Sequence, residues 1–173
     1  DPRIELMSAE VHCQEAFSSS EVRVVGADAF QACTRIRTAL LPRAVAIEDY
    51  AFQEAGSLTT VFIPMAHTIG RRAFQNCSML SQANLSLVQN LSEAAFQHCT
   101  SLRTVELPMA MNLSRLIFQG CRNLERVEAP LAFSVGDSAF EGDASLRGFD
   151  MPNVIMVGRN AFAGCFSLSS VDL

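Results

Sequence analysis

The sequence predicts an α/β solenoid, in which short parallel strands, turns and return segments wind into a stack of similar coils. The first observation is that phenylalanine recurs at a constant interval of 22 residues. The second is a frame around it, in which Ala precedes most copies and Cys follows three residues later in five of them. The third is a set of apolar residues six, nine and eleven places after each phenylalanine. A period of 20 to 50 residues is typical of solenoids, whose units bury their apolar faces against their neighbours. The phenylalanines are Phe30, Phe52, Phe74, Phe96, Phe118, Phe140 and Phe162.

The strand of each repeat is predicted eight to eleven residues after the phenylalanine. In residues 102–108, LRTVELP, apolar Val105 and Leu107 alternate with polar Thr104 and Glu106. This alternation is typical of a half-buried strand. Proline follows directly in most repeats and ends the strand because it lacks an N–H donor, whereas Ser86 takes its place in one repeat.

A return segment and a short turn complete the predicted coil. The return segment carries an apolar residue and often Gly, as in residues 69–70 and 157–158. The AFxxC stretch places a large aromatic side chain between small ones, which suits one inward-packed turn of α- or 3₁₀-helix. We therefore expect a parallel sheet on the concave face, with helical or 3₁₀ turns and return strands on the other side.

The combined frame, LxxVxLPxxxxxIGxxAFxxC, resembles the BspA-like leucine-rich repeats. Residues 57–77, SLTTVFIPMAHTIGRRAFQNC, show it best, and the resemblance covers residues 25–173. Members of that family are mostly surface or secreted proteins of bacteria and protozoa that contact host proteins or other cells. The resemblance therefore implies a protein-binding module for adhesion or host interaction, located outside the cell or on its surface.

The two ends of the array depart from the regular pattern. Residues 25–173 form the array of 22-residue units, and its last residues, 171–173, read as a strand without a cap. An uncapped end exposes a strand edge, so we expect either a fragment of a longer array or self-association through the ends.

The phase of the repeat changes near the N-terminus. Residues 4–6 resemble the strand at 105–107, and Phe17 follows them at the usual distance, yet Phe17 precedes Phe30 by only 13 residues. We therefore expect residues 1–24 to form a shortened, degenerate repeat or cap.

Composition excludes some function classes. Net charge is −5, all 13 basic residues are Arg, and no basic patch occurs, so nucleic acid is not an expected partner. No apolar run has the 18 residues of a membrane-spanning helix. Five of the six cysteines share one repeat position that should point inward, so we expect free, buried thiols; Cys13 lies outside this ladder.

No catalytic, cofactor or metal-binding motif is present. The three histidines, His12, His67 and His98, occupy unrelated repeat positions, and no phosphate-binding loop, GxSxG, HExxH or CxxC occurs. We predict that the chain is not an enzyme and needs no cofactor or metal.

The variable strand positions are the candidate protein-binding site, because they face solvent on the predicted concave sheet. Ten residues after each phenylalanine, the side chains change from apolar to acidic along the array. A surface of this kind suits a basic protein partner, although any solvated sheet face also requires polar residues. The candidate residues are Leu40, Phe62, Asn84, Glu106, Arg126, Glu128, Asp150 and Asp172.

Two other functions stay open at this point. The repeats could form an intracellular scaffold or effector segment, in a host cytosol after secretion or in the cytoplasm, that selects targets for a catalytic domain elsewhere. The absence of lysine, which prevents ubiquitination, and the expected free thiols favour that alternative. A mainly structural spacer is the third.

Overall fold

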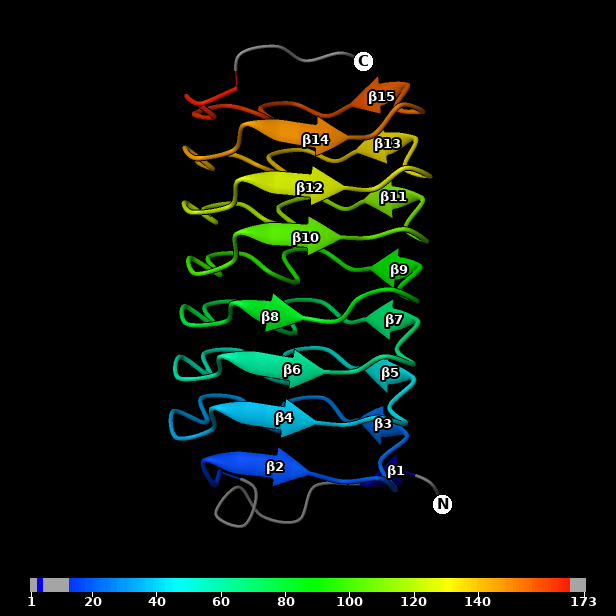
Figure 1. Cartoon of the computed structure of the whole chain (residues 1–173), viewed down its shortest axis with the longest axis vertical. Coiled ribbons are helices and arrows are strands. Elements are labelled where there is room, and N and C mark those ends of the chain that lie inside the picture. The colour runs from blue at the N-terminus through cyan, green and yellow to red at the C-terminus, as the bar shows by residue number, and fades with distance from the viewer. Residues whose placement is uncertain (1–2, 5–12, 169–173) are drawn as a thin grey trace.

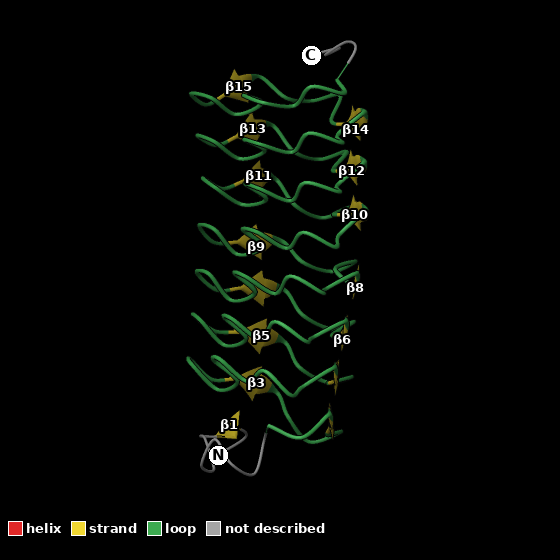
Figure 2. Cartoon of the chain, turned by 90° about the vertical axis from the view of Figure 1, so that its left-hand side faces the viewer, coloured by secondary structure: helices red, strands yellow, loops and turns green. Residues whose placement is uncertain are grey.

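The computed structural model of the chain describes residues 3–4 and 13–168 and shows a stack of coils built only from strands, turns and loops (Figures 1 and 2). Each coil contributes one strand to each of two sides. We call the first side the wide sheet; its strands are β2 (Ala16–Ser18), β4 (Thr38–Leu40), β6 (Thr60–Phe62), β8 (Gln82–Ala83), β10 (Thr104–Glu106), β12 (Arg126–Glu128) and β14 (Gly148–Asp150). The second is the return sheet, with β1 (Arg3–Ile4), β3 (Val24–Val25), β5 (Ala46–Ile47), β7 (Thr68–Ile69), β9 (Asn90–Leu91), β11 (Asn112–Leu113), β13 (Ser134–Val135) and β15 (Met156–Val157).

The strands pair in parallel with a register that follows the sequence period. Val105 pairs with Val127, and Val127 with Phe149, so corresponding residues of successive coils lie side by side. A fixed register keeps each apolar position on the buried face of the sheet, since a slip of one residue would turn it to solvent. The strands predicted after Phe30 to Phe140, their parallel pairing and the solenoid arrangement are therefore confirmed.

The AFxxC stretch does not form the helical or 3₁₀ turn predicted from sequence; the described residues contain no helix of either kind. Tyr50 and Glu54, which flank Phe52 at two residues' distance, have φ of 58° and 62°, and the corresponding residues of other coils are also left-handed. A right-handed helix cannot contain such residues. The fold is consequently a β-solenoid rather than an α/β one.

Hydrogen bonding explains why the turn takes this form. The N–H groups of Phe52 and Glu54 donate to carbonyls of the next coil, at 2.7 and 2.8 Å, whereas that of Gln53 donates three residues back, to Tyr50, at 2.9 Å. A helix would direct all these donors along its own backbone. The turn instead divides them between its own coil and the next one, which adds a third line of inter-coil hydrogen bonds beside the two sheets.

The core is a continuous column of phenylalanine rings. Adjacent rings are stacked, with centroids 4.8 Å apart for Phe30 and Phe52 and 5.1 Å apart for Phe74 and Phe96. One residue after the phenylalanines, polar side chains form a parallel ladder from Gln31 to Glu141, in which Gln97 donates to Gln119 and accepts from Gln75. Burial of these aromatic side chains and of the aliphatic residues around them stabilises the stack.

Both sheets are interrupted at the same junction, between the coil of β8 and β9 and the coil of β10 and β11. Within the described residues, β8 does not pair with β10, and β9 does not pair with β11. The gap is visible on both sides of the stack in Figure 1. The turns nevertheless stay joined across it, because the N–H of Phe96 donates to the carbonyl of Ile117 at 3.0 Å. We call this junction the interruption.

The interruption coincides with the repeat in which Ser86 replaces proline. Oδ1 of Asn84 accepts hydrogen bonds from the N–H of Ser86 at 3.3 Å and from its hydroxyl at 2.9 Å. Asn and Ser side chains that bond locally compete with strand pairing in this way. Strand β8 therefore ends at Ala83, one residue earlier than the corresponding three-residue strands.

The N-terminal coil corrects two expectations. Phe17 lies in strand β2 opposite Ala39, so it occupies a strand position and not that of an AFxxC phenylalanine. Ile4, expected in a strand of the wide sheet, pairs with Val25 in the return sheet. The array therefore continues in phase to residue 16. The division of the chain into 1–24 and 25–173 stays a prediction, and the terminal strand at 171–173 lies outside the described residues.

Cysteine pairing differs from expectation at one position. Cys33 forms a disulfide with Cys13, with Cα atoms 5.4 Å apart, whereas Cys77, Cys99 and Cys121 are free and buried as predicted. Neighbours in the cysteine ladder point the same way, but Cys13 approaches from the N-terminal coil and can face Cys33. Cys165 is free and half-buried.

Candidate functional site

The wide sheet presents most of the predicted binding residues in one row along the stack, namely Leu40, Phe62, Asn84, Glu106, Glu128 and Asp150. Arg126 lies outside this row, because it pairs with Thr104 and Gly148. Leu40 pairs with Phe62 in the register of β4 and β6, and Glu106 pairs with Glu128, which pairs with Asp150. The residues that alternate with them are buried or, at Ala83 and Phe149, partly buried, so the row faces outward. Leu40 and Phe62 are 39% and 41% exposed, respectively, which is high for large apolar side chains. Asp172, the last predicted member, lies outside the described residues.

The acids of the row are not equivalent. Glu128 forms an ion pair with the neighbouring Arg126, with Nε and Oε1 2.6 Å apart. This hydrogen bond and the charge of Glu128 raise the pKa of Arg126 above its usual value. Within the described part of the chain, Glu106 and Asp150 form no ion pair, so they are the acids most available to a partner.

Among the arginines beside the row, Arg126 forms an ion pair with Glu128, and the charge of Asp150 makes a smaller contribution to the raised pKa of Arg126. Arg103 pairs with Glu125, at 3.0 Å, and not with a member of the row. Arg126 therefore neutralises Glu128, whereas Arg103 forms no ion pair with a member of the row in the described part of the chain. The net result is a row that is apolar at Leu40 and Phe62 and negative at Glu106 and Asp150.

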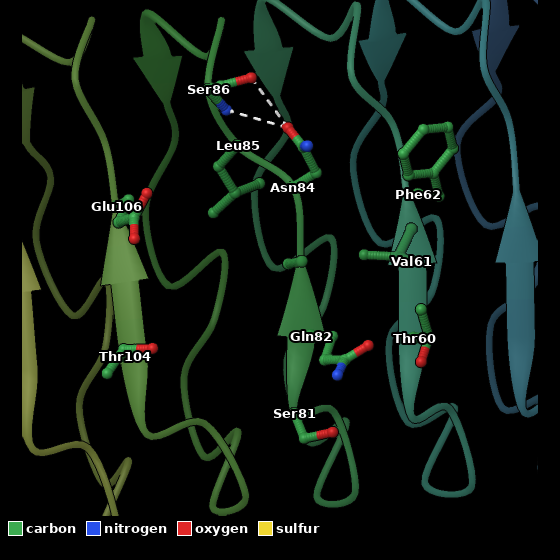
Figure 3. A pocket seen from close by; sticks show the side chains of 11 residues that line it. Thr60, Val61, Phe62, Ser81, Gln82, Asn84, Leu85, Ser86, Thr104 and Glu106 are labelled. Carbon is green, nitrogen blue, oxygen red and sulfur yellow. Dashed lines mark hydrogen bonds between the residues drawn. The ribbon is translucent and has the colours of Figure 1, made fainter.

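A hollow of about 380 Å³ opens on this face at the interruption. Figure 3 shows Phe62 on one side, Glu106 on the other, and the Asn84–Ser86 turn between them. Phe62, Asn84 and Glu106 are among the candidate residues predicted from the sequence. Gln82 and Thr104, at variable strand positions, and Ser81 were not among those candidates but also line the hollow. The sequence feature that could have indicated this hollow is Ser86, which replaces the proline that ends most strands.

A second hollow, of about 390 Å³, lies on the return side of the same interruption. It is lined by residues 89–93 of the coil that contains β9, and by Asn112 and Ser114 of the next coil. The hydroxyl of Ser114 donates to the carbonyl of Leu91, where the other coils use a main-chain N–H, as Gly136 does to Leu113. The interruption therefore opens the solenoid on both sides.

One buried acid lies inside the core, at the turn position three residues after the phenylalanine rather than on a strand. Asp143 occupies a position that is Cys in five repeats, it has no solvent exposure, and neither carboxylate oxygen has a hydrogen-bond partner. Burial raises the pKa of Asp143 to about 9, against the smaller opposing effect of the Cys121 and Gly120 backbone. The thiols of Cys121 and Cys165 on either side donate to the carbonyls of Phe96 and Phe140.

The described residues contain no group of three or more His, Cys, Asp or Glu side chains that could hold a metal ion. Nor do they contain a helix long and apolar enough to cross a membrane. Burial raises the pKa of Cys77 to about 12, and it raises those of Cys99 and Cys121 as well, which opposes formation of a nucleophilic thiolate.

Comparisons with known proteins identify the repeat. The family model described as "BspA type Leucine rich repeat region" matches residues 9–125 and 67–173, in six copies. No curated protein is similar to the chain at a significant level.

Solved structures support the same assignment. A leucine-rich cell surface protein from Faecalibacterium prausnitzii is 30% identical, with a TM-score of 0.80 over 86% of this chain and 42% of its own. A leucine-rich repeat protein of T. pallidum is 24% identical, with a TM-score of 0.81 over 91% of this chain and 79% of its own, and so shares the fold. The chain thus spans less than half of the F. prausnitzii protein. It belongs to the BspA-type leucine-rich repeat family.

Proposed function

We propose that this chain is a non-catalytic module that binds a basic protein partner through the wide sheet. The observation that carries the proposal is the outward row, which joins the exposed apolar side chains of Leu40 and Phe62 to the unpaired acids Glu106 and Asp150. An apolar anchor region beside uncompensated charge is typical of a surface that selects its partner by charge and gains affinity from burial.

The location that we propose is the cell surface or the extracellular space, in an adhesion or host-interaction role. The F. prausnitzii structure of the same family is described as a cell surface protein. The Cys13–Cys33 disulfide also supports an oxidising compartment.

The alternative is an intracellular scaffold or effector segment that selects targets for a catalytic domain elsewhere. The free thiols of Cys77, Cys99 and Cys121 and the absence of lysine favour it. Self-association through the ends of the stack stays a prediction, which light scattering over a range of protein concentrations tests.

A pull-down tests the proposal. The chain serves as bait against extracellular-matrix proteins and, in parallel, against a cytosolic lysate. Glu106→Gln with Asp150→Asn removes the two unpaired acids of the row. The matched control, Glu54→Gln with Asp28→Asn, removes the same charge from exposed turn residues that form no ion pair.

Each outcome decides between the alternatives. Capture of a basic matrix or surface protein, lost with the row variant and kept with the control, supports the proposal. Capture only from the cytosolic lysate supports the scaffold, and equal capture by both variants refutes the row as the site.

A further inference from the structure

We propose that the hollow at the interruption binds one arginine side chain of the partner protein, with the guanidinium at Glu106 and the alkyl stem against Phe62. The inference rests on the proposed function, because the arginine belongs to the basic partner. It goes further in naming the side chain that enters, the place where it enters and the two walls that hold it.

The shape of the hollow follows from the interruption. In the other coils the strand residues of adjacent repeats pair directly, whereas here β8 ends early and does not pair with β10. The row position between Phe62 and Glu106 belongs to Asn84, whose Oδ1 accepts two hydrogen bonds from Ser86 within its own turn. The walls therefore stand apart across a recess, as Figure 3 shows.

The recess is large enough to admit one long side chain. Its volume of about 380 Å³ is near the lower end of the range for ligand pockets. Phe62 is 41% exposed and offers an apolar surface on one side. A long side chain with an apolar stem and a charged end matches a recess with one apolar and one charged wall.

The charge of the recess selects a cation. Glu106 is the only ionisable group among the residues that line it, and it forms no ion pair in the described part of the chain. The remaining lining side chains supply neutral amides and hydroxyls, among them Gln82 and Thr104. An anion or an acidic peptide would meet an uncompensated carboxylate there.

Arginine fits the recess better than lysine for geometric reasons. Its planar guanidinium has five donors, so it can bond both oxygens of a carboxylate and still reach neutral acceptors beside it. The ammonium of lysine is a more strongly hydrated point charge and loses more on entering a partly closed recess. Arginine is also among the residues that dominate binding energies at protein interfaces.

The test uses a small probe, so it does not depend on finding the partner. N-acetyl-arginine methylamide is titrated into the isotope-labelled chain and the backbone amide signals are followed by NMR. The lysine and citrulline derivatives serve as comparison probes, since citrulline keeps the shape of arginine without its charge. We expect saturable shifts at Leu85 and Glu106 with arginine, weaker binding with lysine and none with citrulline.

Two variants locate the probe. Glu106→Gln should weaken arginine binding about tenfold, the size expected for loss of a hydrogen-bonded charge partner. Asp150→Asn, which removes the other unpaired acid of the row outside the recess, should leave binding unchanged. The spectra themselves report whether each variant is folded.

The outcomes separate this inference from the proposed function. Absence of shifts at these amides, or equal weakening by Glu106→Gln and Asp150→Asn, overturns the arginine site. If a basic partner is captured through the row but Glu106→Gln leaves its affinity unchanged, the proposed function stands and the arginine site falls. If the probe binds as expected and no basic partner is captured, the arginine site is supported and the proposed function is refuted.

Discussion

Replacing Asp143 with alanine should stabilise the protein at neutral pH, although the side chain is in the centre of the core. Alanine is compatible with the position, since Ala55 occupies it in another repeat and is fully buried. Asp143 is the one buried charged or polar residue of the described core, and both its carboxylate oxygens lack partners. A buried group of this kind is costly in its charged form.

The magnitude follows from the pKa. Burial raises the pKa of Asp143 from 3.8 to about 9, so at pH 7 the carboxyl is ionised in the unfolded chain and protonated in the folded one. Folding at pH 7 must therefore take up a proton, at a cost of about 4 kcal/mol, or about 1.4 kcal/mol for each pH unit above 3.8. Alanine removes this cost and loses about 1 kcal/mol through the small void it leaves.

The sign of the pH dependence is opposite to that of a paired surface acid. Because the folded pKa is raised, the contribution of Asp143 to stability is fully present below pH 3.8 and is lost as the pH rises toward about 9. The gain from Asp143→Ala should accordingly be absent near pH 4, about 3 kcal/mol at pH 7, and larger at pH 9.

Urea unfolding followed by circular dichroism measures this difference for the wild type and the variant at each pH. A second variant, Asp143→Cys, restores the residue found in five repeats and should give the same trend under reducing conditions. A gain that does not change between pH 5 and pH 8 would refute the reasoning, as would destabilisation by alanine at pH 7.

Three further predictions concern the ladders. The amide hydrogen of Arg103 should exchange with solvent faster than those of Ser81 and Glu125 in the neighbouring coils, because it lacks the inter-coil hydrogen bond that they form; hydrogen exchange followed by NMR measures this. Gln97→Ala should lower the free energy of unfolding by about 1–3 kcal/mol, since it leaves two ladder partners without their bonds, and an unchanged urea midpoint would argue against the ladder. The thiols of Cys77 and Cys99 should not react with a thiol reagent at pH 8 until the chain unfolds, and rapid modification of the native protein would contradict their burial.

Much of this fold could be predicted from the period of the sequence. The 22-residue interval and the alternation around Val105 are enough to place the strands and align them, because a solenoid repeats one set of contacts in every coil. The outward row followed from the same alternation. The structure places its residues side by side except at the interruption, where the recess lies between Phe62 and Glu106, and their role in binding stays a prediction.

The left-handed conformation of the turn residues could not be predicted, because no single residue type marks those positions in the sequence. Left-handed residues are usually recognised by glycine, yet here the positions carry Ala32, Tyr50 and Leu116 as well as Gly142. Inter-coil hydrogen bonds, which a single repeat does not reveal, hold these residues in place. The small–aromatic–small pattern of AFxxC therefore suggested a helix that the stack does not contain.

The prediction for the N-terminal coil was wrong for a different reason. Phe17 is apolar and aromatic, so it fits a strand position as well as a turn position, and only its pairing with Ala39 distinguishes the two. The partner of Cys33 was unpredictable for the same reason, since Cys13 lies outside the repeated frame. The recess at the interruption was signalled by Ser86, but its shape depends on the local bonds of Asn84.

The affinity of a captured partner for two charge-matched variants tests the central claim most directly. Binding is measured by isothermal titration for the wild type, for Glu106→Gln with Asp150→Asn, and for Glu54→Gln with Asp28→Asn. Both double variants change the net charge by the same amount, so long-range attraction falls equally in both. The account predicts that only the first variant loses at least tenfold in affinity, whereas equal losses, or a loss confined to the turn variant, would contradict recognition through the wide sheet.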